Sequence, residues 1–156
     1  MEIKAKRGFT LLELVTVVAI LGVIAAIAFP SYQNSVRKTK RAEVQAEMAE
    51  ISSKLQRFKL ANFHYVQSTR GGVITPINLT RVGYSSATPN SENGLYQYRL
   101  AFNANATEWT LTATPITTGM QKGTGALTLN HAGQQCWYKN KDTFTATDTC
   151  LAWSDK

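Results

Sequence analysis

Residues 9–29 read FTLLELVTVVAILGVIAAIAF, a run of 21 residues whose single charged side chain is that of Glu13. Because a helix rises about 1.5 Å per residue, this run spans about 30 Å, the thickness of the hydrocarbon core of a membrane. The rest of the 156-residue chain is too small to enclose such a helix in a soluble core. The run therefore predicts a membrane-spanning helix.

A secretory signal peptide is the second interpretation of the same run. The residues Ala26-Ile27-Ala28 before Phe29 have the small side chains of a signal-peptidase site. The apolar region of a signal peptide has about 7–15 residues, however, which is shorter than this run. The length therefore favours a membrane helix that is retained.

Glu13 is the residue of this run for which a function is most expected. A carboxylate at the centre of a membrane helix costs about 2.5–3.5 kcal/mol, and such residues are usually functional. Glu13 follows Phe9 by four residues, so it lies near the helix N-terminus, where the helix dipole favours a negative charge. The structural alternative is a carboxylate that only reaches the membrane interface.

Two residues that are unfavourable in helices lie in or next to the run, Gly22 inside it and Pro30 directly after it. Proline lacks an N–H and disfavours helical geometry at the preceding residue, so Pro30 is expected to end or kink the helix. Both residue types are common in membrane helices, and neither identifies a protein class by itself.

The residues before the run complete a motif. The stretch KRGFTLLELVTVVAILGVIAAIAFPSY has a basic leader that ends at Gly8, followed by Phe9, and Glu13 is the fifth residue after Gly8. With Gly22 and Pro30, these residues resemble the N-terminus of a type IV prepilin over residues 4–32.

The resemblance implies processing and assembly at the inner membrane. A prepilin peptidase would cut between Gly8 and Phe9 on the cytoplasmic side and methylate the new amine. Glu13 would neutralise the Phe9 amine of a neighbouring pilin subunit, because opposite charges are favourable partners in a medium of low dielectric constant. The protein would cross the inner membrane once and then join an extracellular pilus on the bacterial surface.

Charge does not decide the orientation of the helix. Basic side chains lie on both sides of the run, at Lys4, Lys6, Arg7, Arg37, Lys38, Lys40 and Arg41. Since the positive-inside rule counts both flanks, export of the C-terminal part follows from the prepilin resemblance alone. The net charge of +7 also comes mostly from the N-terminal part, which gives weak support for nucleic-acid binding.

Residues 31–64 predict an amphipathic helix, since Ser31 to Phe63 contain neither Gly nor Pro. Apolar residues recur at spacings of three and four, at Tyr32, Val36, Val44, Met48, Ile51, Leu55 and Phe58. We expect this stripe to pack on a sheet while the other face meets water or neighbouring subunits. An independent coiled coil would need a longer heptad repeat.

Residues 65–156 have the pattern of a small β-rich head. Apolar and polar residues alternate over 96–102 and 109–113, and residues 126–129 and 136–138 read as two further strands. The turn signals between residues 71 and 94 predict a loop. Three or four antiparallel strands packed on a helix define the α+β class.

The two cysteines, Cys136 and Cys150, lie in this head. If the head is exported to an oxidising compartment, a disulfide that closes the loop 136–150 is expected. Closing a loop of this size contributes about 3 kcal/mol in the chain-entropy model. In a cytosolic protein the alternative is two separate thiols.

The segment TATPITTGMQKGTGALTLNHAGQQCWY resembles the last strands of minor pilins of the PilE and ComP type. The two resemblances imply the type IV pilin fold, with a cleaved leader at 1–8, a membrane and polymerisation helix at 9–30, an amphipathic helix at 31–64 and a β head at 65–156. They imply a structural subunit of a type IV pilus, a minor one, with a role in motility, adhesion or DNA uptake. A pseudopilin of a type II secretion system is the first alternative.

A DNA-binding competence pilin is the second alternative. Lys122, Lys139 and Lys141 flank Trp137, and a basic cluster beside an aromatic ring is able to hold phosphates and stack bases. Against this, Asp142 adjoins the cluster, and the DNA receptors that the chain resembles have a second disulfide that it lacks.

No motif for catalysis, a cofactor or a metal is present in the sequence. His64 and His131 are far apart, and neither has a partner at metal-ligand spacing. Oxygen ligands for calcium occur at Asn140, Asp142 and Asp148, but a solvated loop is the favoured interpretation. The sequence therefore predicts a protein that is not an enzyme.

Overall fold

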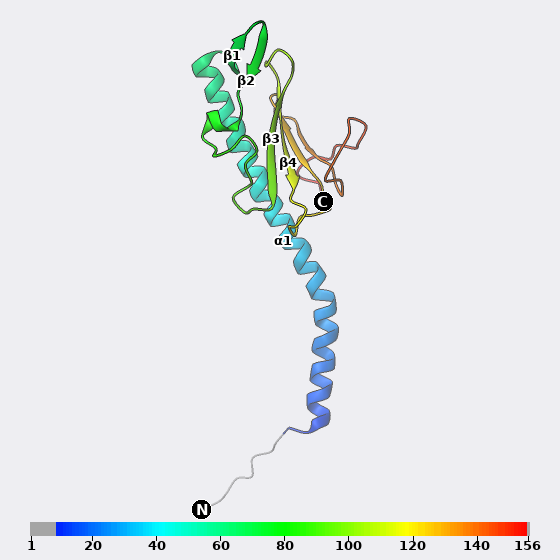
Figure 1. Ribbon diagram of the computed structural model, residues 1–156. Coiled ribbons are helices and arrows are strands. Elements are labelled where there is room, and N and C mark those ends of the chain that lie inside the picture. The colour runs from blue at the N-terminus through cyan, green and yellow to red at the C-terminus, as the bar shows by residue number, and fades with distance from the viewer. Residues whose placement is uncertain (1–8, 156) are drawn as a thin grey trace, which may run out of the picture. The chain divides into compact units, whose positions relative to one another are not determined.

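The computed structural model describes residues 9–155 as one long helix followed by strands (Figure 1). In chain order the elements are α1 (Leu11–Asn62), β1 (Val66–Arg70), β2 (Val73–Pro76), the 3₁₀ helix η1 (Leu79–Val82), β3 (Tyr96–Phe102), β4 (Trp109–Pro115), β5 (Leu127–Asn130) and β6 (Gln135–Trp137). The chain divides into two compact units between Lys38 and Thr39. The predicted α+β class is confirmed.

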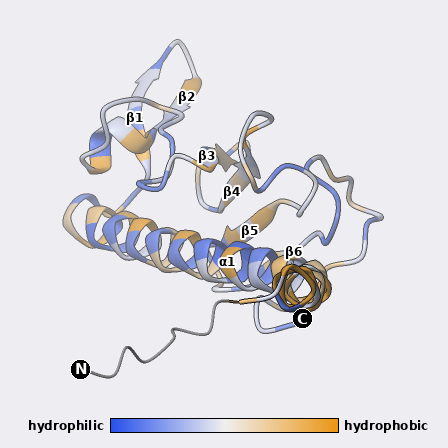
Figure 2. Cartoon of the chain, turned by 90° about the horizontal axis from the view of Figure 1, so that it is seen from below, coloured by the Kyte–Doolittle hydropathy of each residue, from blue (hydrophilic) through white to orange (hydrophobic). Residues whose placement is uncertain are grey.

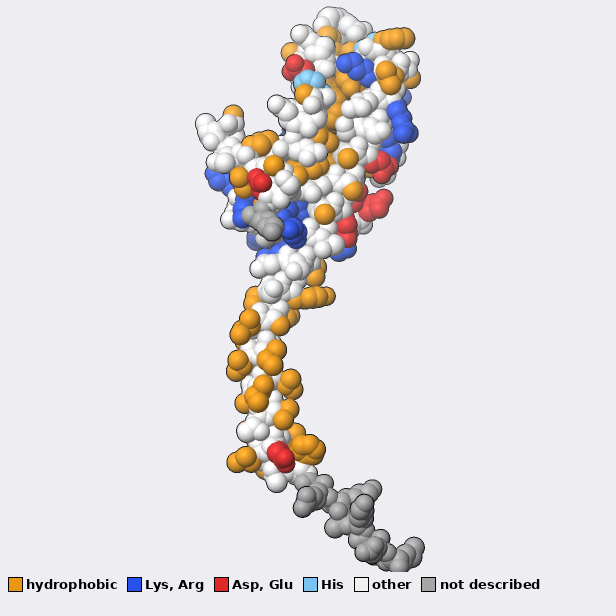
Figure 3. Space-filling view, turned by 180° about the vertical axis from the view of Figure 1, so that it is seen from behind, with side chains coloured by type: hydrophobic (Ala, Val, Ile, Leu, Met, Phe, Trp, Pro, Cys, Tyr) orange, Lys and Arg blue, Asp and Glu red, His pale blue; other side chains and the backbone are white. Residues whose placement is uncertain are grey.

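The first unit is the N-terminal part of α1, and it is exposed. Every residue from 9 to 35 is exposed, and Figure 3 shows hydrophobic side chains along the visible face of the apolar stretch. The helix is long and apolar enough to cross a membrane, by its length and composition. A helix that is apolar on all sides is typical of a membrane span or of a buried core, and here no described part of the chain covers it.

Pro30 lies inside α1 rather than at its end. The helix continues without a break from Leu11 to Asn62, so of the two expectations for Pro30 the end of the helix is wrong, and the kink stays a prediction. The missing N–H of Pro30 removes only one main-chain hydrogen bond. The apolar and amphipathic segments are two halves of one long helix, as the pilin fold implied by the resemblance predicts.

The C-terminal half of α1 packs on the sheet of the second unit. Val44, Met48, Ile51 and Leu55 are completely buried, and their spacing of four, three and four residues places them on one face. Figure 2 shows hydrophobic and hydrophilic residues alternating along this part of α1. The predicted stripe is therefore confirmed from Val44 to Phe58. Its first member, Tyr32, is 69 % exposed, so the prediction is wrong there.

Strands β3 to β6 form one antiparallel sheet in chain order. Leu100 pairs with Leu111, and Ala113 pairs with Leu127. The inward positions of β3 and β4 are buried or, at Leu100 and Phe102, partly buried, whereas Gln97, Arg99 and Thr110 on the alternate positions are exposed. This alternation is the one that predicted β3 and β4, which are confirmed together with the third predicted strand, β5. The fourth strand, which the sequence left open, is β6.

The stretch after α1 differs from the predicted loop. Strands β1 and β2 form an antiparallel hairpin, which Gly71 and Gly72 close with φ angles of 56° and 78°. A Gly-Gly pair that separates two runs of strand-forming residues is a hairpin signal, so the sequence contained the evidence. The hairpin has no buried residue on either face, which explains why no alternation revealed it.

Candidate functional site

The N-terminus of α1 is closed by a reciprocal pair of hydrogen bonds between Thr10 and Glu13. The Glu13 N–H donates to Thr10 Oγ1 at 3.2 Å, and the Thr10 N–H and O–H donate to Glu13 Oε2 at 3.2 and 3.1 Å. This is a capping box, which the spacing of the threonine and the glutamate in the sequence also indicates. Within residues 9–155, Glu13 Oε1 accepts no hydrogen bond, so one carboxylate oxygen remains for a partner from another chain.

The other residues that the prepilin resemblance singles out are also exposed. Phe9 is 83 % exposed, and a Cβ atom added at Gly22 would meet no other atom within 4 Å. Pro30 is exposed within α1. No contact inside the described chain therefore accounts for Phe9, Gly22 or Pro30, and their role in assembly stays a prediction.

The C-terminal loop is closed by the predicted disulfide between Cys136 and Cys150. Its base is also held by main-chain hydrogen bonds, in which Trp137 N donates to Leu151 O at 2.7 Å and Leu151 N donates to Trp137 O at 3.1 Å. The indole N–H of Trp153 donates to Cys136 O at 3.0 Å. The two ends of the loop are therefore joined both covalently and by hydrogen bonds.

Replacing Cys136 and Cys150 by Ser is expected to lower the free energy of unfolding by about 2–3 kcal/mol, because the unfolded chain gains the entropy of an open loop. The Leu151 amide should remain protected from hydrogen exchange, since its bond to Trp137 does not depend on the disulfide. Urea unfolding and amide exchange of the full chain test both points. Loss of protection at Leu151 would show that the disulfide alone closes the loop.

The three lysines proposed from the sequence lie in one region of the fold, which we name the lysine patch (Lys122, Lys139 and Lys141). Main-chain hydrogen bonds join the two segments that carry them, with Ala126 N donating to Lys141 O at 2.8 Å and Asn140 N donating to Thr124 O at 3.2 Å. All three side chains are exposed. Lys141 forms an ion pair with Asp148, which reduces the net positive charge of the patch.

Trp137 is not available to stack on a base, so this part of the predicted DNA contact is wrong. Its side chain is 3 % exposed, and its indole N–H donates to Thr124 O at 3.0 Å. The guanidinium of Arg41 lies 3.7 Å from the centroid of its ring. The neighbouring Tyr138 stacks on Phe144 with ring centroids 3.9 Å apart, so both aromatic residues have partners inside the chain.

Arg41 is a residue that the sequence did not single out. It belongs to a run of charged residues, yet it is 9 % exposed, and burial lowers the pKa of its guanidinium while Tyr96 acts in the opposite sense. Among residues 9–155 no carboxylate forms an ion pair with it. A partner that lies 96 residues away in the sequence, Trp137, could not be identified from local pattern.

The two aspartates of the C-terminal loop bind main-chain N–H groups. Asp142 accepts from Gly123 N at 2.7 Å and Gly125 N at 3.1 Å, and Asp148 accepts from Thr145 N at 2.7 Å. In the part of the chain that the structure describes, no group of three or more His, Cys, Asp or Glu residues is arranged to hold a metal. The geometry therefore assigns these carboxylates to loop structure.

Acid is expected to weaken this loop through Asp148. The hydrogen bond from Lys141, followed by that from Thr145, lowers the pKa of Asp148. Because the pKa of Asp148 is lower in the folded protein than in the unfolded chain, where it is about 4, its carboxylate stabilises the fold at pH values above about 4. This stabilisation is lost as the pH falls through the pKa of the folded protein. The unfolding midpoint of Asp148→Asn should therefore fall less between pH 6 and pH 2 than that of the wild type, with Glu108→Gln as the control. Equal slopes would contradict the prediction.

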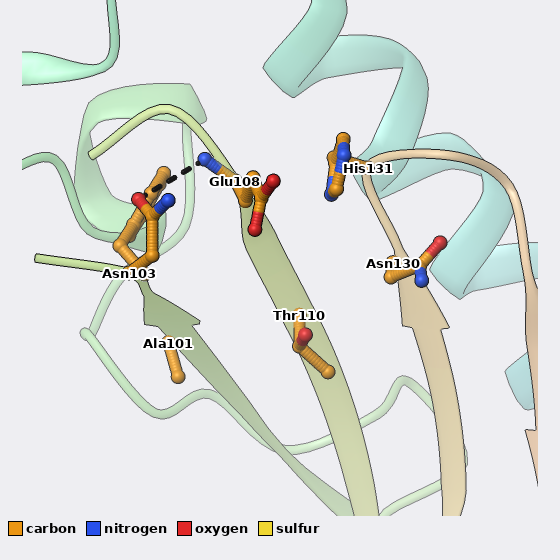
Figure 4. A pocket seen from close by; sticks show the side chains of 7 residues that line it. Ala101, Asn103, Glu108, Thr110, Asn130 and His131 are labelled. Atoms are coloured by element: carbon orange, nitrogen blue, oxygen red, sulfur yellow. Dashed lines mark hydrogen bonds between the residues drawn. The ribbon is translucent and has the colours of Figure 1, made fainter. Parts of the chain in front are cut away.

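A shallow pocket of about 270 Å³ lies where β3 and β5 end and β4 begins, and His131 is part of it (Figure 4). Its amide side chains hold turns, since Asn103 Oδ1 accepts from Glu108 N at 3.2 Å and Asn130 Oδ1 accepts from Gln134 N at 2.9 Å. The polar groups of this pocket therefore stabilise the hairpins, and we assign no reaction to it.

Comparison with known proteins gives two family matches. Residues 30–128 match the family described as type IV minor pilin ComP, DNA uptake sequence receptor. Residues 3–29 match the prokaryotic N-terminal methylation motif. The first match covers more than half of the chain.

Individual relatives include pilus and secretion proteins. The fimbrial protein EcpC of Eikenella corrodens is 31 % identical over 96 % of this chain and 82 % of its own length. A fimbrial protein of Pseudomonas aeruginosa is 31 % identical over 67 % of this chain and 65 % of its own length. The type II secretion system core protein G of Escherichia coli (strain K12) is 32 % identical over 42 % of this chain and 46 % of its own length.

Proposed function

This chain belongs to the type IV minor pilin family, and on that premise we propose that it is a structural subunit of a type IV pilus. The family is one of structural pilins rather than of enzymes, and it implies assembly with other pilin subunits. The observation that carries the proposal is the exposed apolar stretch of α1 over residues 11–29. Such a surface is stable only in a membrane or against other helices.

The proposed maturation begins with a prepilin peptidase, which cuts between Gly8 and Phe9 and methylates the new amine. The leader at residues 1–8 lies outside the described residues, and the match to the methylation motif over residues 3–29 supports this step. The amine of Phe9 then meets Glu13 of a neighbouring subunit, for which the open Oε1 atom is available.

The proposed assignment of the chain has four parts. The leader is removed, residues 9–30 serve as membrane and polymerisation helix, residues 31–64 support the head, and residues 65–156 form the head with its disulfide loop. Before assembly the subunit is held in the inner membrane by α1, and afterwards the head lies on the surface of an extracellular pilus.

The decisive experiment is to determine the N-terminal residue and its mass on protein recovered from sheared pili and from membranes. We expect N-methylated Phe9 in both fractions. A chain that begins at Met1 would contradict processing, and one that begins at Phe29 would indicate an exported protein without its membrane helix. Either result would remove the role of Glu13 and would refute the proposal.

A pseudopilin of a type II secretion system is the first alternative, supported by the similarity to core protein G over 66 residues. Because an apolar N-terminal helix would hold a pilin and a pseudopilin in the membrane in the same way, the two are distinguished by the proteins with which the chain assembles. The full chain, cross-linked in the native membrane and purified, should carry pilus subunits if it is a pilin. Recovery of secretion-system subunits in their place would favour the alternative.

DNA reception is a second candidate function, since the matched family is described as a DNA uptake sequence receptor. The exposed lysine patch is a candidate contact for phosphates. Each lysine that contacts a phosphate contributes about one unit to the salt dependence of binding, so changing all three to Ala should lower that slope by up to about three units. Unchanged DNA binding by a triple variant that still enters pili would exclude the patch, and Arg99→Ala serves as the control for loss of charge.

A further inference from the structure

A second groove lies beside the outer edge of β3, and we name it the amide groove after the residues that line it (Asn90, Gln97, Thr114, Pro115, Ile116 and Thr117). Its volume is about 340 Å³. Gln97 of β3 pairs with Thr114 of β4, two strands that Figure 1 shows side by side, and Asn90 forms an isolated bridge with Gln97. Because the side chains of paired residues lie about 5 Å apart on one face of a sheet, two amides and a hydroxyl follow one another in a row.

The polar side chains of this row are available to a ligand. Other asparagines of the head, such as Asn93 and Asn130, use their amides to hold turns. Among residues 9–155, by contrast, the side chains of Asn90, Gln97 and Thr114 find no hydrogen-bond partner. Asn90 and Gln97 are exposed and Thr114 is half-buried, so the hydroxyl lies deeper in the groove than the two amides.

The lining of the amide groove is uncharged. Its six residues, all of them in the part of the chain that the structure describes, include no Lys, Arg, His, Asp or Glu. Phosphates and other anions are bound chiefly by Lys and Arg, and metal ions by carboxylates, imidazoles and thiolates. In a chain with a net charge of +7, this lining therefore favours a ligand that is itself uncharged and carries several hydrogen-bonding groups.

The edge of β3 beside the groove is already paired. Ser91 N donates to Tyr96 O at 2.8 Å, and Tyr98 N donates to Pro89 O at 2.8 Å. A peptide that added a strand at this edge would need the same main-chain groups, so β-augmentation is not available here. The ligand must therefore be recognised by side chains.

A saccharide without charged groups meets these conditions. Its hydroxyls both donate and accept, and each side-chain amide offers two donors and two acceptor lone pairs to neighbouring hydroxyls. The half-buried Ile116 supplies an aliphatic surface for the carbon atoms of a sugar ring. A volume of about 340 Å³ is near the lower end for small-molecule sites, which suits one or two sugar rings.

We propose that the amide groove binds a neutral saccharide, with Asn90, Gln97 and Thr114 as its hydrogen-bonding residues. This activity goes beyond assembly, because it would give the head a means of attachment to glycans. The groove lies entirely within the second unit, so the inference does not rest on how α1 is anchored.

The test measures binding of the full chain, held in a mild detergent, to an array of immobilised saccharides. The array carries glucose, galactose, mannose, N-acetylglucosamine, N-acetylgalactosamine and their disaccharides, with sialylated and sulfated saccharides for comparison. We expect the chain to bind at least one of the neutral saccharides, and we expect added salt to leave this binding unchanged, because no ion pair contributes to it.

Three variants locate the site. Asn90→Ala, Gln97→Ala and Thr114→Val should each weaken the binding of the neutral saccharide about fivefold, the effect of one lost hydrogen bond. The matched controls are Gln135→Ala, at an exposed glutamine of β6, and Thr110→Val, at an exposed threonine of β4. Neither residue lines the amide groove, so both controls should bind like the wild type.

Failure to bind any neutral saccharide of the array would overturn the inference. Binding confined to the sialylated or sulfated saccharides and abolished by salt would also overturn it, because the contact would then be ionic. Binding that the three groove variants leave unchanged, or that the two controls weaken equally, would place the ligand elsewhere. None of these results bears on pilus assembly, whereas an unprocessed N-terminus would refute the proposed function and leave this binding as it is.

Discussion

Replacing Glu13 by Gln is expected to remove this subunit almost completely from assembled pili while leaving it in the membrane. Glutamine at this position still accepts the hydrogen bonds of a capping box, so α1 begins as before and only the charge is lost. The amine of Phe9 on the neighbouring subunit then lacks its counter-ion. A buried charge without its partner costs about 3–5 kcal/mol, which predicts a loss of at least tenfold.

The measurement is the ratio of the protein in sheared pili to that in membranes, by immunoblot. Glu108→Gln is the matched control, because Glu108 is an exposed carboxylate of the head. A variant with Asp in place of Glu13 should assemble partly, since it keeps the charge on a shorter side chain. Normal incorporation of Glu13→Gln would show that assembly does not depend on this carboxylate.

Replacing Gly125 by Ala is expected to have the largest effect on the stability of the head. Gly125 has a φ angle of 108°, and a Cβ atom there would collide with the main-chain carbonyl of Tyr138. The two hydrogen bonds of the neighbouring Ala126, to Lys141 O and from Tyr138 N, would have to open. With a strain of about 1–3 kcal/mol and about 1 kcal/mol for each bond, we expect a loss of about 3 kcal/mol or more in urea unfolding.

Gly123 offers a matched control two residues earlier in the same loop. Its φ angle is 77°, but a Cβ atom there would meet no atom within 4 Å. Gly123→Ala should therefore cost only the strain of the left-handed conformation, about 1–2 kcal/mol. If both variants lost the same stability, backbone strain would account for the effect at Gly125 and the collision with Tyr138 would not.

The elements that could be predicted from the sequence are those whose burial follows a regular period. Val44, Met48, Ile51 and Leu55 recur at helical spacing, and the alternation in β3 and β4 follows the pleat of a sheet. The exposed apolar stretch of α1 could be predicted from its length and composition. In each case the residues nearby in the sequence determine whether a side chain is buried or exposed, so the local sequence pattern is sufficient to predict the element.

The errors have the opposite origin. The hairpin of β1 and β2 has no buried residue on either face, so its sequence shows no alternation of apolar and polar residues. The Gly71-Gly72 turn was the one remaining signal for it. Trp137 was expected to meet DNA because lysines surround it, but Arg41, Thr124 and the core occupy its surfaces. Contacts between α1 and a strand near the C-terminus arise from tertiary packing, and the residues next to Trp137 in the sequence carry no information about them.

The N-terminal site was predicted in part. The position of Glu13 near the end of a membrane helix indicated a function, and the resemblance supplied the neighbouring amine as its partner. The bonds to Thr10 were not anticipated, although a threonine three residues before a glutamate indicates a capping box. The structure adds that the two oxygens of Glu13 are not equivalent, because only Oε2 is engaged.

The capping box also bears on what maturation does to the protein. Thr10 and Glu13 both follow the proposed cut after Gly8, so the bonds that start α1 lie entirely in the part that is kept. Removal of the leader would therefore leave the first turn of the helix as it was and would place a positive amine at Phe9. The peptidase would act as an electrostatic switch on a rigid helix end, and a subunit would become competent to assemble without refolding.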